Sequence, residues 1–336
     1  PLLVDKFLDN AIEVDVDAIG DGKTVVLGGI MEHIEEAGIH SGDSSCSLPP
    51  YTLSEGLVEE IATKTRRLAM ELQVIGLMNV QWAVRGAKLY ILEANPRASR
   101  TVPYVSKAIG QPLAKMAARI MLGETIAQVG AHENLTPPYF SVKAPVFPFN
   151  KFHGVDTVLG PEMKSTGEVM GIDSTFGMAF VKAETAAGTT LPTEGLVFLS
   201  LADKDKPAGL VVAKRLRALG LGIAATSGTA HYLERFGIKV DEIVAKVSES
   251  SDPARTAVGL IEAGRVAFVV NTPRGSGSRS DGQAIRMAAN VHRVSSVTTI
   301  EAALAAFHGL LEQRERPVTV RSIQEYHASG SRSATR

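Results

Sequence analysis

The sequence predicts an α/β protein in which an antiparallel sheet with helices is followed by a parallel sheet with helices on both faces. Strand-like segments joined by short turns dominate the first part of the chain, and strands alternate with helices after Gly195. The 336 residues are enough for about two domains at roughly 150 residues each. We expect the domains to span residues 1–188 and 189–327, with a flexible tail over 328–336.

The first part opens with segments whose polarity alternates. Over residues 11–19, Glu13, Asp15 and Asp17 fall on one face and apolar side chains on the other, which is typical of a half-buried strand. A glycine-containing turn leads into a second apolar strand, so an antiparallel hairpin is predicted. We expect Asp15 and Asp17 to lie on the solvated face.

Cap and turn signals predict the next elements. The run from Thr52 to Glu55 has the pattern of a capping box, so a helix should begin there. A second hairpin follows, with strands over 79–84 and 88–94 and with Trp82 expected in the core.

Proline and glycine divide the rest of the chain. Another helix is expected from Pro112 to Gly123, and the Pro- and Gly-rich residues 130–190 are expected to close the first domain irregularly. After Gly195 the pattern predicts strands over 196–201, 221–226 and 266–271, alternating with helices over 207–219, from 229, and near 281–290 and 299–313.

The composition excludes several classes of protein. A net charge of −1 gives no attraction to nucleic acid or to an anionic membrane surface, and no apolar run approaches the roughly 20 residues of a membrane span. The single cysteine, Cys46, cannot form an intramolecular disulfide and is expected to be a small buried residue, which favours a cytoplasmic protein. Because the chain begins at Pro1 without a signal-peptide pattern, we expect a fragment of a longer protein.

The second hairpin carries the sharpest chemical pattern. Glu93 and Asn95 are two residues apart and share a strand face, and a short turn places Gln81 opposite Glu93. One carboxylate and two amide oxygens are ligands that suit Mg²⁺, and Arg97 and Arg100 follow at once to hold anionic oxygens. An ordinary solvated hairpin face remains an equal alternative from this pattern alone.

Longer motifs carry a resemblance to a known family. The run from Leu92 to Arg97 resembles the strand-end motif of ATP-grasp enzymes, in which the Glu and Asn bind the magnesium ions of ATP. The segments 31–44, 93–103 and 159–171 resemble the C-terminal portion of carbamoyl-phosphate synthase large subunits specifically. The resemblance implies an ATP-grasp C-terminal lobe, ATP and Mg²⁺ or Mn²⁺ as cofactors, and K⁺ as a further ion.

The resemblance also implies roles for individual residues. Lys6 and Leu8 would line the adenine site, and Glu13 would contact the ribose. The loop of Gly38, Ile39, His40 and Ser41 would line the ribose–phosphate path. The metal ions would be held by Gln81, Glu93 and Asn95. Arg97 and Arg100 would position carbamate and the transferred phosphoryl group, and His40 would be a polar contact in the catalytic site.

The implied reaction is ATP-dependent phosphorylation of carbamate to carbamoyl phosphate, for pyrimidine and arginine biosynthesis. The implied partners are the rest of the large chain and a glutaminase small subunit. These 336 residues lack the N-terminal lobe and the glycine-rich lid of an ATP-grasp unit. We therefore expect the chain alone to be inactive.

The second part resembles the methylglyoxal-synthase-like regulatory domain of the same family, a Rossmann-like parallel-sheet fold. Hydroxyl and amide side chains at strand ends, with nearby lysines, predict a phosphate site at the carboxyl edge of the sheet. By resemblance the site takes UMP or IMP through Ser200, Lys206, Thr226, Thr229, Lys246, Asn271 and Thr272.

The family's ornithine site is less well matched. Glu35, Asp43 and Thr298 match its contacts, but Ala144 and Val297 stand where acidic residues are expected, so ornithine control should be weak.

Two alternatives to the synthase remain open. One is a stand-alone nucleotide-binding regulatory module whose catalytic part is silent. The other is a different ATP-grasp ligase, such as a biotin carboxylase, against which the regulatory domain and the 159–171 motif argue.

Overall fold

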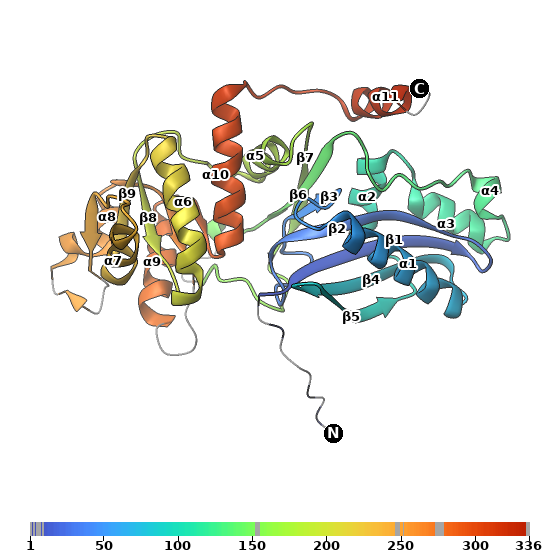
Figure 1. Ribbon diagram of the computed structural model, residues 1–336, viewed down its shortest axis with the longest axis horizontal. Helices are drawn as coiled ribbons and strands as arrows, with labels where there is room; N and C mark the ends of the chain where they lie inside the picture. Colours follow the sequence, from blue (N-terminus) through green and yellow to red (C-terminus); the bar gives the residue numbers. More distant parts are fainter. Residues whose placement is uncertain are drawn as a thin grey trace. The chain divides into compact units, whose positions relative to one another are not determined.

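The computed structural model describes residues 2, 4, 8, 10–151, 155–245, 249–250, 252–272 and 279–333 (Figure 1). It divides into two compact units, which are described separately. The first comprises Pro1–Lys143, Ile172–Ala179 and Thr319–Arg336, and the second comprises Ala144–Gly171 and Phe180–Val318. This division differs from the single boundary expected at 188/189, because the chain crosses between the units more than once.

Among the described residues, seven strands form one sheet in the order β5-β4-β1-β2-β3-β6-β7. Both predicted hairpins are confirmed, since β1 pairs with β2 and β4 pairs with β5 in antiparallel fashion. The strands are β1 (Ile12–Asp21), β2 (Val25–Glu36), β3 (Cys46–Leu48), β4 (Ile75–Arg85), β5 (Lys88–Asn95), β6 (Phe140–Val146) and β7 (Gly167–Asp173).

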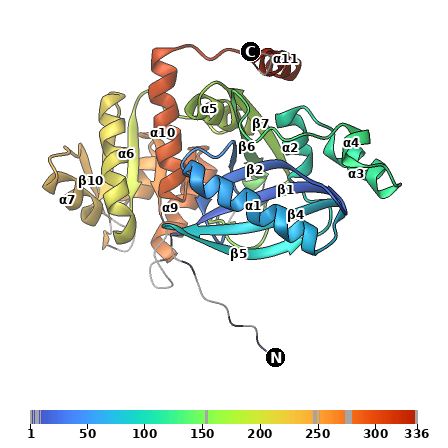
Figure 2. The ribbon, with the colours of Figure 1, turned by 45° about the vertical axis from the view of Figure 1, so that its right-hand side comes forward.

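Helices cover this sheet through its apolar side chains. The helix α1 (Glu55–Glu71) lies across β1 and β4 (Figure 2). Its Ile61 belongs to the same buried cluster as Val14, Val80 and Trp82 of these strands. As predicted, Trp82 is buried, and its indole Nε1 donates to Thr65 Oγ1 at 3.1 Å. The other helices are α2 (Val102–Ile109), α3 (Leu113–Met121), α4 (Ile126–Val129), α5 (Phe176–Ala187) and α11 (Ile323–Ser333).

The start of α1 is as predicted, but its cap is not the expected one. Ser54 is the N-cap and accepts from the Leu57 backbone N–H at 3.4 Å. The Thr52 hydroxyl instead donates to the buried Glu32, whose carboxylate also accepts from the backbone N–H groups of residues 51–53. The carboxylate of Glu32 therefore anchors the loop that leads into the helix.

One expectation was wrong. Residues 130–190 are not irregular, because β6, β7 and α5 lie within them and the prolines and glycines fall mainly in the connections. Near the end of the chain, α11 spans Ile323–Ser333. Its Tyr326 hydroxyl donates to the Ile172 carbonyl at 2.9 Å, and its ring packs edge-on against Tyr139.

The second unit contains the predicted parallel sheet, in the order β10-β9-β8-β11-β12. Its strands are β8 (Leu196–Ser200), β9 (Gly222–Thr226), β10 (Glu242–Val244), β11 (Val266–Asn271) and β12 (Ser296–Val297). Its helices are α6 (Lys206–Ala218), α7 (Ser227–Arg235), α8 (Ala257–Glu262), α9 (Arg279–Val291) and α10 (Ile300–Glu315).

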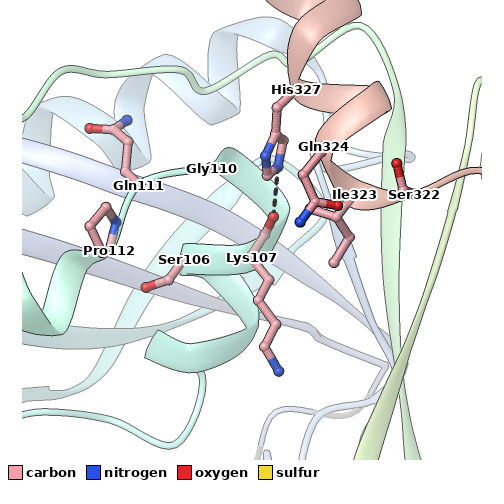
Figure 3. Close-up of a pocket in the computed structure, with 9 residues that line it drawn as sticks. All are labelled: Ser106, Lys107, Gly110, Gln111, Pro112, Ser322, Ile323, Gln324 and His327. Carbon is pink, nitrogen blue, oxygen red and sulfur yellow. Dashed lines mark hydrogen bonds between the residues drawn. The ribbon is translucent and has the colours of Figure 1, made fainter.

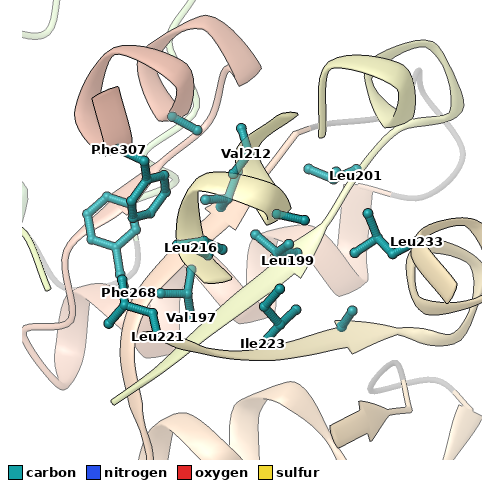
Figure 4. Close-up of a cluster of buried hydrophobic side chains, with 14 of the residues drawn as sticks. Val197, Leu199, Leu201, Val212, Leu216, Leu221, Ile223, Leu233, Phe268 and Phe307 are labelled. Carbon is teal, nitrogen blue, oxygen red and sulfur yellow. The ribbon is translucent and has the colours of Figure 1, made fainter. Parts of the chain in front are cut away.

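Both faces of this sheet are covered, as predicted. On one face Val197 and Leu199 of β8 pack with side chains of α6, α7 and α10, including Phe307, whose ring meets that of Phe268 edge-on (Figure 4). On the other face Phe198 packs with α8 and α9. The alternation of buried side chains along β8 follows from the two-residue period of a strand.

Candidate functional site

Polar side chains form two consecutive rows across one face of the first sheet. In one row Glu93, Gln81 and Asp15 lie opposite one another on β5, β4 and β1. In the next row Asn95, Asn79 and Asp17 do the same. The predicted pairing of Gln81 with Glu93 is therefore present, and Asn95 Nδ2 donates to Glu93 Oε1 at 2.7 Å, so the two share a face.

The amide groups in these rows lie beside carboxylates. Gln81 faces Asp15 across the β1–β4 pair and contributes to lowering the pKa of Asp15. Asn95 turns its amide nitrogen to Glu93, because a carboxylate only accepts. The amide oxygens of Gln81 and Asn95, together with the exposed Glu93 carboxylate, make up an oxygen-only ligand set that fits Mg²⁺.

The expectation that Asp15 and Asp17 are solvated was wrong, since they are 1% and 0% exposed. Asp17 accepts from Ser99 Oγ at 2.7 Å, Thr101 Oγ1 at 2.6 Å and Asn79 Nδ2 at 3.0 Å. Burial raises the pKa of Asp17 to about 6 despite these hydrogen bonds. The strand pattern could not reveal this burial, because the covering side chains follow Asn95, far along the chain.

Asp15 belongs to a buried charged group. His33 Nε2 lies 2.9 Å from Asp15 Oδ2. Burial opposes ionisation of Asp15, but the hydrogen bond from His33 and the charges of His33 and Lys143 lower its pKa. Lys143 of β6 is itself buried, and its Nζ donates to the Ser41 carbonyl at 2.8 Å. The sequence reasoning missed Lys143, because no local pattern signals a buried lysine.

The loop after β2 lies beside this group. Burial is the main cause that raises the pKa of the Glu13 carboxyl, and the Gly38 backbone of this loop acts in the opposite direction. His40 Nδ1 accepts from the Gly42 backbone N–H at 3.0 Å. Because Lys143 also holds Ser41, four of the predicted nucleotide residues, Glu13, Gly38, His40 and Ser41, surround one region of the sheet.

The structure gives fewer contacts for the other predicted site residues. Arg97 and Arg100 are exposed and follow directly on the end of β5, and Arg97 Nη1 donates to the Ala98 carbonyl at 3.2 Å. Leu8 lies outside the helices and strands, Ile39 is buried, and Lys6 lies outside the described residues. Within the described ranges there is no group of three or more His, Cys, Asp or Glu side chains that could hold a metal.

A second polar site lies at the carboxyl edge of the parallel sheet. The central strand β8 has β9 on one side and β11 on the other, so the strand order reverses there, which is where such sheets bind ligands. Leu201 N donates to Thr229 Oγ1 at 3.1 Å, Ala202 N donates to Thr272 Oγ1 at 2.8 Å, and Thr272 N donates to the Ser200 carbonyl at 3.0 Å. The loop after β8 is thus joined to both neighbouring strand ends.

A cation and a helix N-terminus meet at this edge. Thr226 is the N-cap of α7, and its side chain makes no capping hydrogen bond. Lys206 Nζ lies 3.6 Å from the position that a Cβ on Gly228 would take, and it pairs with Asp203 Oδ1 at 2.7 Å. The ammonium and the first backbone N–H groups of α7 suit a phosphate. Lys246 lies outside the described residues.

A shallow pocket of the first unit lies on other elements. It is lined by residues of α2, of the connection from α2 to α3 and of the start of α11, and His327 Nε2 donates to the Lys107 carbonyl at 2.9 Å (Figure 3). It contains none of the predicted site residues.

Comparisons with known proteins follow the same two-part division. Residues 1–129 match the family model described as the carbamoyl-phosphate synthase L chain, ATP binding domain, and residues 209–298 match the MGS-like domain. The carbamoyl phosphate synthase large chain of Archaeoglobus fulgidus is 52% identical over 328 residues, which cover 97% of this chain and 30% of that protein. The chain belongs to the carbamoyl phosphate synthase large-chain family.

Other members of the family agree. The large chain of Rubrobacter xylanophilus is 52% identical over 98% of this chain and 31% of that protein, and that of Pasteurella multocida is 54% identical over 91% and 28%. The chain thus spans about 30% of the length of the curated relatives it matches. The biotin carboxylase domain of a single-chain bacterial carboxylase is 21% identical, with a TM-score of 0.43 over 54% of this chain and 48% of that one, a likeness too distant to support an argument.

In the part of the chain that the structure describes, no helix has both the length and the apolar character that a bilayer crossing requires.

Proposed function

We propose that this chain is the part of a carbamoyl phosphate synthase that positions ATP and its metal ions for phosphorylation of carbamate and that binds a regulatory nucleoside monophosphate. The observation that supports the first role is the row in which Gln81 lies opposite Glu93, beside Asn95, whose amide nitrogen is used within the protein. The amide oxygens of Gln81 and Asn95 and the Glu93 carboxylate are left for a hard cation.

The residues around the hairpin suit phosphoryl transfer. A bound Mg²⁺ supplies neutralisation of the charge on the transferred phosphoryl group. Arg97 and Arg100, at the end of β5, would hold the anionic oxygens of carbamate and phosphate, which the metal alone leaves unpaired. Glu13 and the loop of Gly38, Ile39, His40 and Ser41 would hold the ribose and phosphates, with Lys6 and Leu8 at the adenine. The chain's contribution is thus position and charge.

The buried group behind the hairpin would keep the ligands in place. Asp15 lies opposite Gln81, and His33 and Lys143 keep Asp15 ionised, because both place positive charge or a hydrogen-bond donor beside it. The metal-binding amide of Gln81 therefore lies next to a buried charged group.

Metal binding tests this role directly. We expect Glu93→Gln to weaken Mn²⁺ binding to the chain in the presence of ATP by about tenfold, because the ligand set loses its only carboxylate. The measurement is electron paramagnetic resonance of free Mn²⁺ during titration. Glu59→Gln, on the exposed side of α1, is the matched control and should leave the titration unchanged. Equal titration curves for all three proteins would remove Glu93 from the metal site.

The carboxyl edge of the parallel sheet is proposed to take UMP or IMP. Ser200, Thr226, Thr229, Asn271 and Thr272 converge there, and Lys206 supplies the positive charge at the start of α7. Lys246 remains part of the proposal by resemblance alone. We expect UMP to raise the thermal transition of the chain, whereas ornithine, which lacks acidic partners at Ala144 and Val297, should shift it little. A clear shift with sub-millimolar ornithine would contradict this.

The wider setting of the family belongs to the same proposal. It comprises K⁺ as a further ion, the rest of the large chain and a glutaminase small subunit as partners, pyrimidine and arginine biosynthesis as the setting, and a cytoplasmic location. The buried Ser44 hydroxyl, which has no hydrogen-bond partner in the described structure, offers an oxygen ligand that K⁺ accepts. We also propose that the 336 residues alone do not make carbamoyl phosphate. Synthesis by this chain alone would refute that part.

The alternative function is a stand-alone nucleotide-binding module. Calorimetric titrations with UMP and with ATP–Mg²⁺ distinguish the two. Binding of UMP without any binding of ATP–Mg²⁺ favours the module.

A further inference from the structure

A buried arginine contacts the nucleotide edge from behind. Arg286 of α9 is 2% exposed, and its Nη1 donates to Asn271 Oδ1 at 2.6 Å. Arginine carries only donors, so the atom of Asn271 that faces it must be the oxygen. Within the described part of the chain, this is the only hydrogen bond of the Asn271 side chain, so its amide nitrogen remains available to a ligand.

Asp156 holds the opposite side of the same guanidinium. Its Oδ1 and Oδ2 accept from Arg286 Nε and Nη2 at 2.7 and 2.8 Å, a bidentate pair that fixes the plane of the guanidinium. Asp156 is in turn fixed by the Val158 backbone N–H at 3.1 Å, while its carbonyl accepts from Lys164 Nζ at 3.3 Å. Arg286 therefore has one orientation, in which Nη1 faces Asn271.

A glycine makes room for the contact. A Cβ built on Gly282 would lie 2.9 Å from Arg286 Nη1 and 3.2 Å from Asn271 Oδ1. Both distances are too short for an alanine without movement of one partner. Since Gly282 lies inside α9, where glycine is otherwise unfavourable, the packing of Arg286 against Asn271 accounts for it.

We propose that Arg286 is a positioning residue that locks the Asn271 amide with its nitrogen toward the ligand, so that this position of the site recognises a hydrogen-bond acceptor. The inference rests on the proposed binding of a nucleoside monophosphate at this edge. The acceptor is a phosphate or base carbonyl oxygen of that ligand. A ligand group that only donates would find no partner there, because the Asn271 oxygen is already engaged.

A double-mutant cycle tests whether Arg286 acts through Asn271. Binding of UMP to the full chain is measured by titration calorimetry for the wild type, Asn271→Ala, Arg286→Lys and the double variant. We expect Kd to rise about tenfold for Asn271→Ala and about fivefold for Arg286→Lys, because lysine cannot hold both Asp156 oxygens and Asn271. The double variant should bind as weakly as Asn271→Ala alone, whereas multiplied effects would overturn the proposal.

Two further variants separate positioning from folding. Gly282→Ala adds a good helix former but disturbs the Arg286–Asn271 contact, so the thermal transition should be kept while UMP binding weakens at least threefold. Unchanged UMP binding by Gly282→Ala would contradict the proposal, even where Arg286→Lys does not fold. Arg265→Lys, in a surface pair with Glu242, is the matched control and should bind as the wild type. Absence of UMP binding by the wild type would instead refute the proposed nucleotide site, and the inference with it.

Discussion

The pKa of Asp17 predicts an unusual pH dependence of stability. Its carboxyl is fully buried, and its pKa is raised from 3.8 to about 6, chiefly by burial. Between these pH values the folded chain keeps a proton that the unfolded chain has lost. The contribution of Asp17 to the free energy of unfolding therefore falls as pH rises from about 4 to about 6. At about 1.4 kcal/mol per pH unit, the full change is about 3 kcal/mol.

Asp17→Asn removes this titration while keeping a similar shape. The free energy of unfolding of the variant minus that of the wild type should therefore increase by up to about 3 kcal/mol between pH 4 and pH 7. The assay is urea unfolding followed by the fluorescence of Trp82, the only tryptophan in the sequence, which lies in the same sheet as Asp17. The fluorescence of Trp82 therefore reports the unfolding of the first unit and not that of the second.

Asp21→Asn is the control of opposite sign. Burial of Asp21 is outweighed by the backbone N–H groups of Ile126, Thr24 and Lys23, so its pKa is lowered. The stabilisation that the Asp21 carboxylate gives the folded chain is present above the pKa of Asp21 in the unfolded chain and is lost as pH falls. Asp21→Asn should therefore become less stable relative to the wild type as pH rises. A pH-independent difference between Asp17→Asn and the wild type would refute the reasoning about Asp17.

The remaining predictions concern packing in each unit. Phe307→Ala should lower the free energy of unfolding of the second unit by about 3–5 kcal/mol, because the ring is fully buried against Phe268, and a calorimetric loss below about 1 kcal/mol would contradict this. Gly110→Ala should destabilise the first unit by at least about 1 kcal/mol in the Trp82-monitored assay, since Gly110 has a φ of 75° and its Cβ would lie 3.0 Å from His327 Nδ1. His327→Ala should recover only part of that loss, because the backbone strain remains, and full recovery would argue against the strain.

The regular strands and helices were predictable because their signals are local. The β11 boundaries, the two hairpins and the alternation after Gly195 follow from period and turn residues alone. The elements β6, β7 and α5 were missed because proline and glycine between short elements resemble a long irregular segment. Whether a polar strand face is solvated depends on which distant segments cover it, as Ser99 and Thr101 cover Asp17.

The candidate sites were also predictable only where their signals are local. The pairing of Gln81 with Glu93 follows from strand period and turn length, so the sequence could predict it. The roles of Lys143 and Arg286 could not be predicted, because each contacts a residue more than a dozen positions away through tertiary packing: Lys143 donates to the Ser41 carbonyl, and Arg286 donates to the Asn271 side chain. A buried lysine or arginine has no local pattern that distinguishes it from a surface one.

The most direct test of the account is hydrogen–deuterium exchange of the chain with and without UMP. The account predicts slower exchange at the carboxyl edge of the parallel sheet, over residues 200–206, 226–229 and 271–272, because the ligand would engage the backbone there. It predicts no change across β4 and β5, which are assigned to ATP and its metal ions. Protection confined to β4 and β5, or no protection anywhere, would contradict the division of the chain into a catalytic and a regulatory nucleotide site.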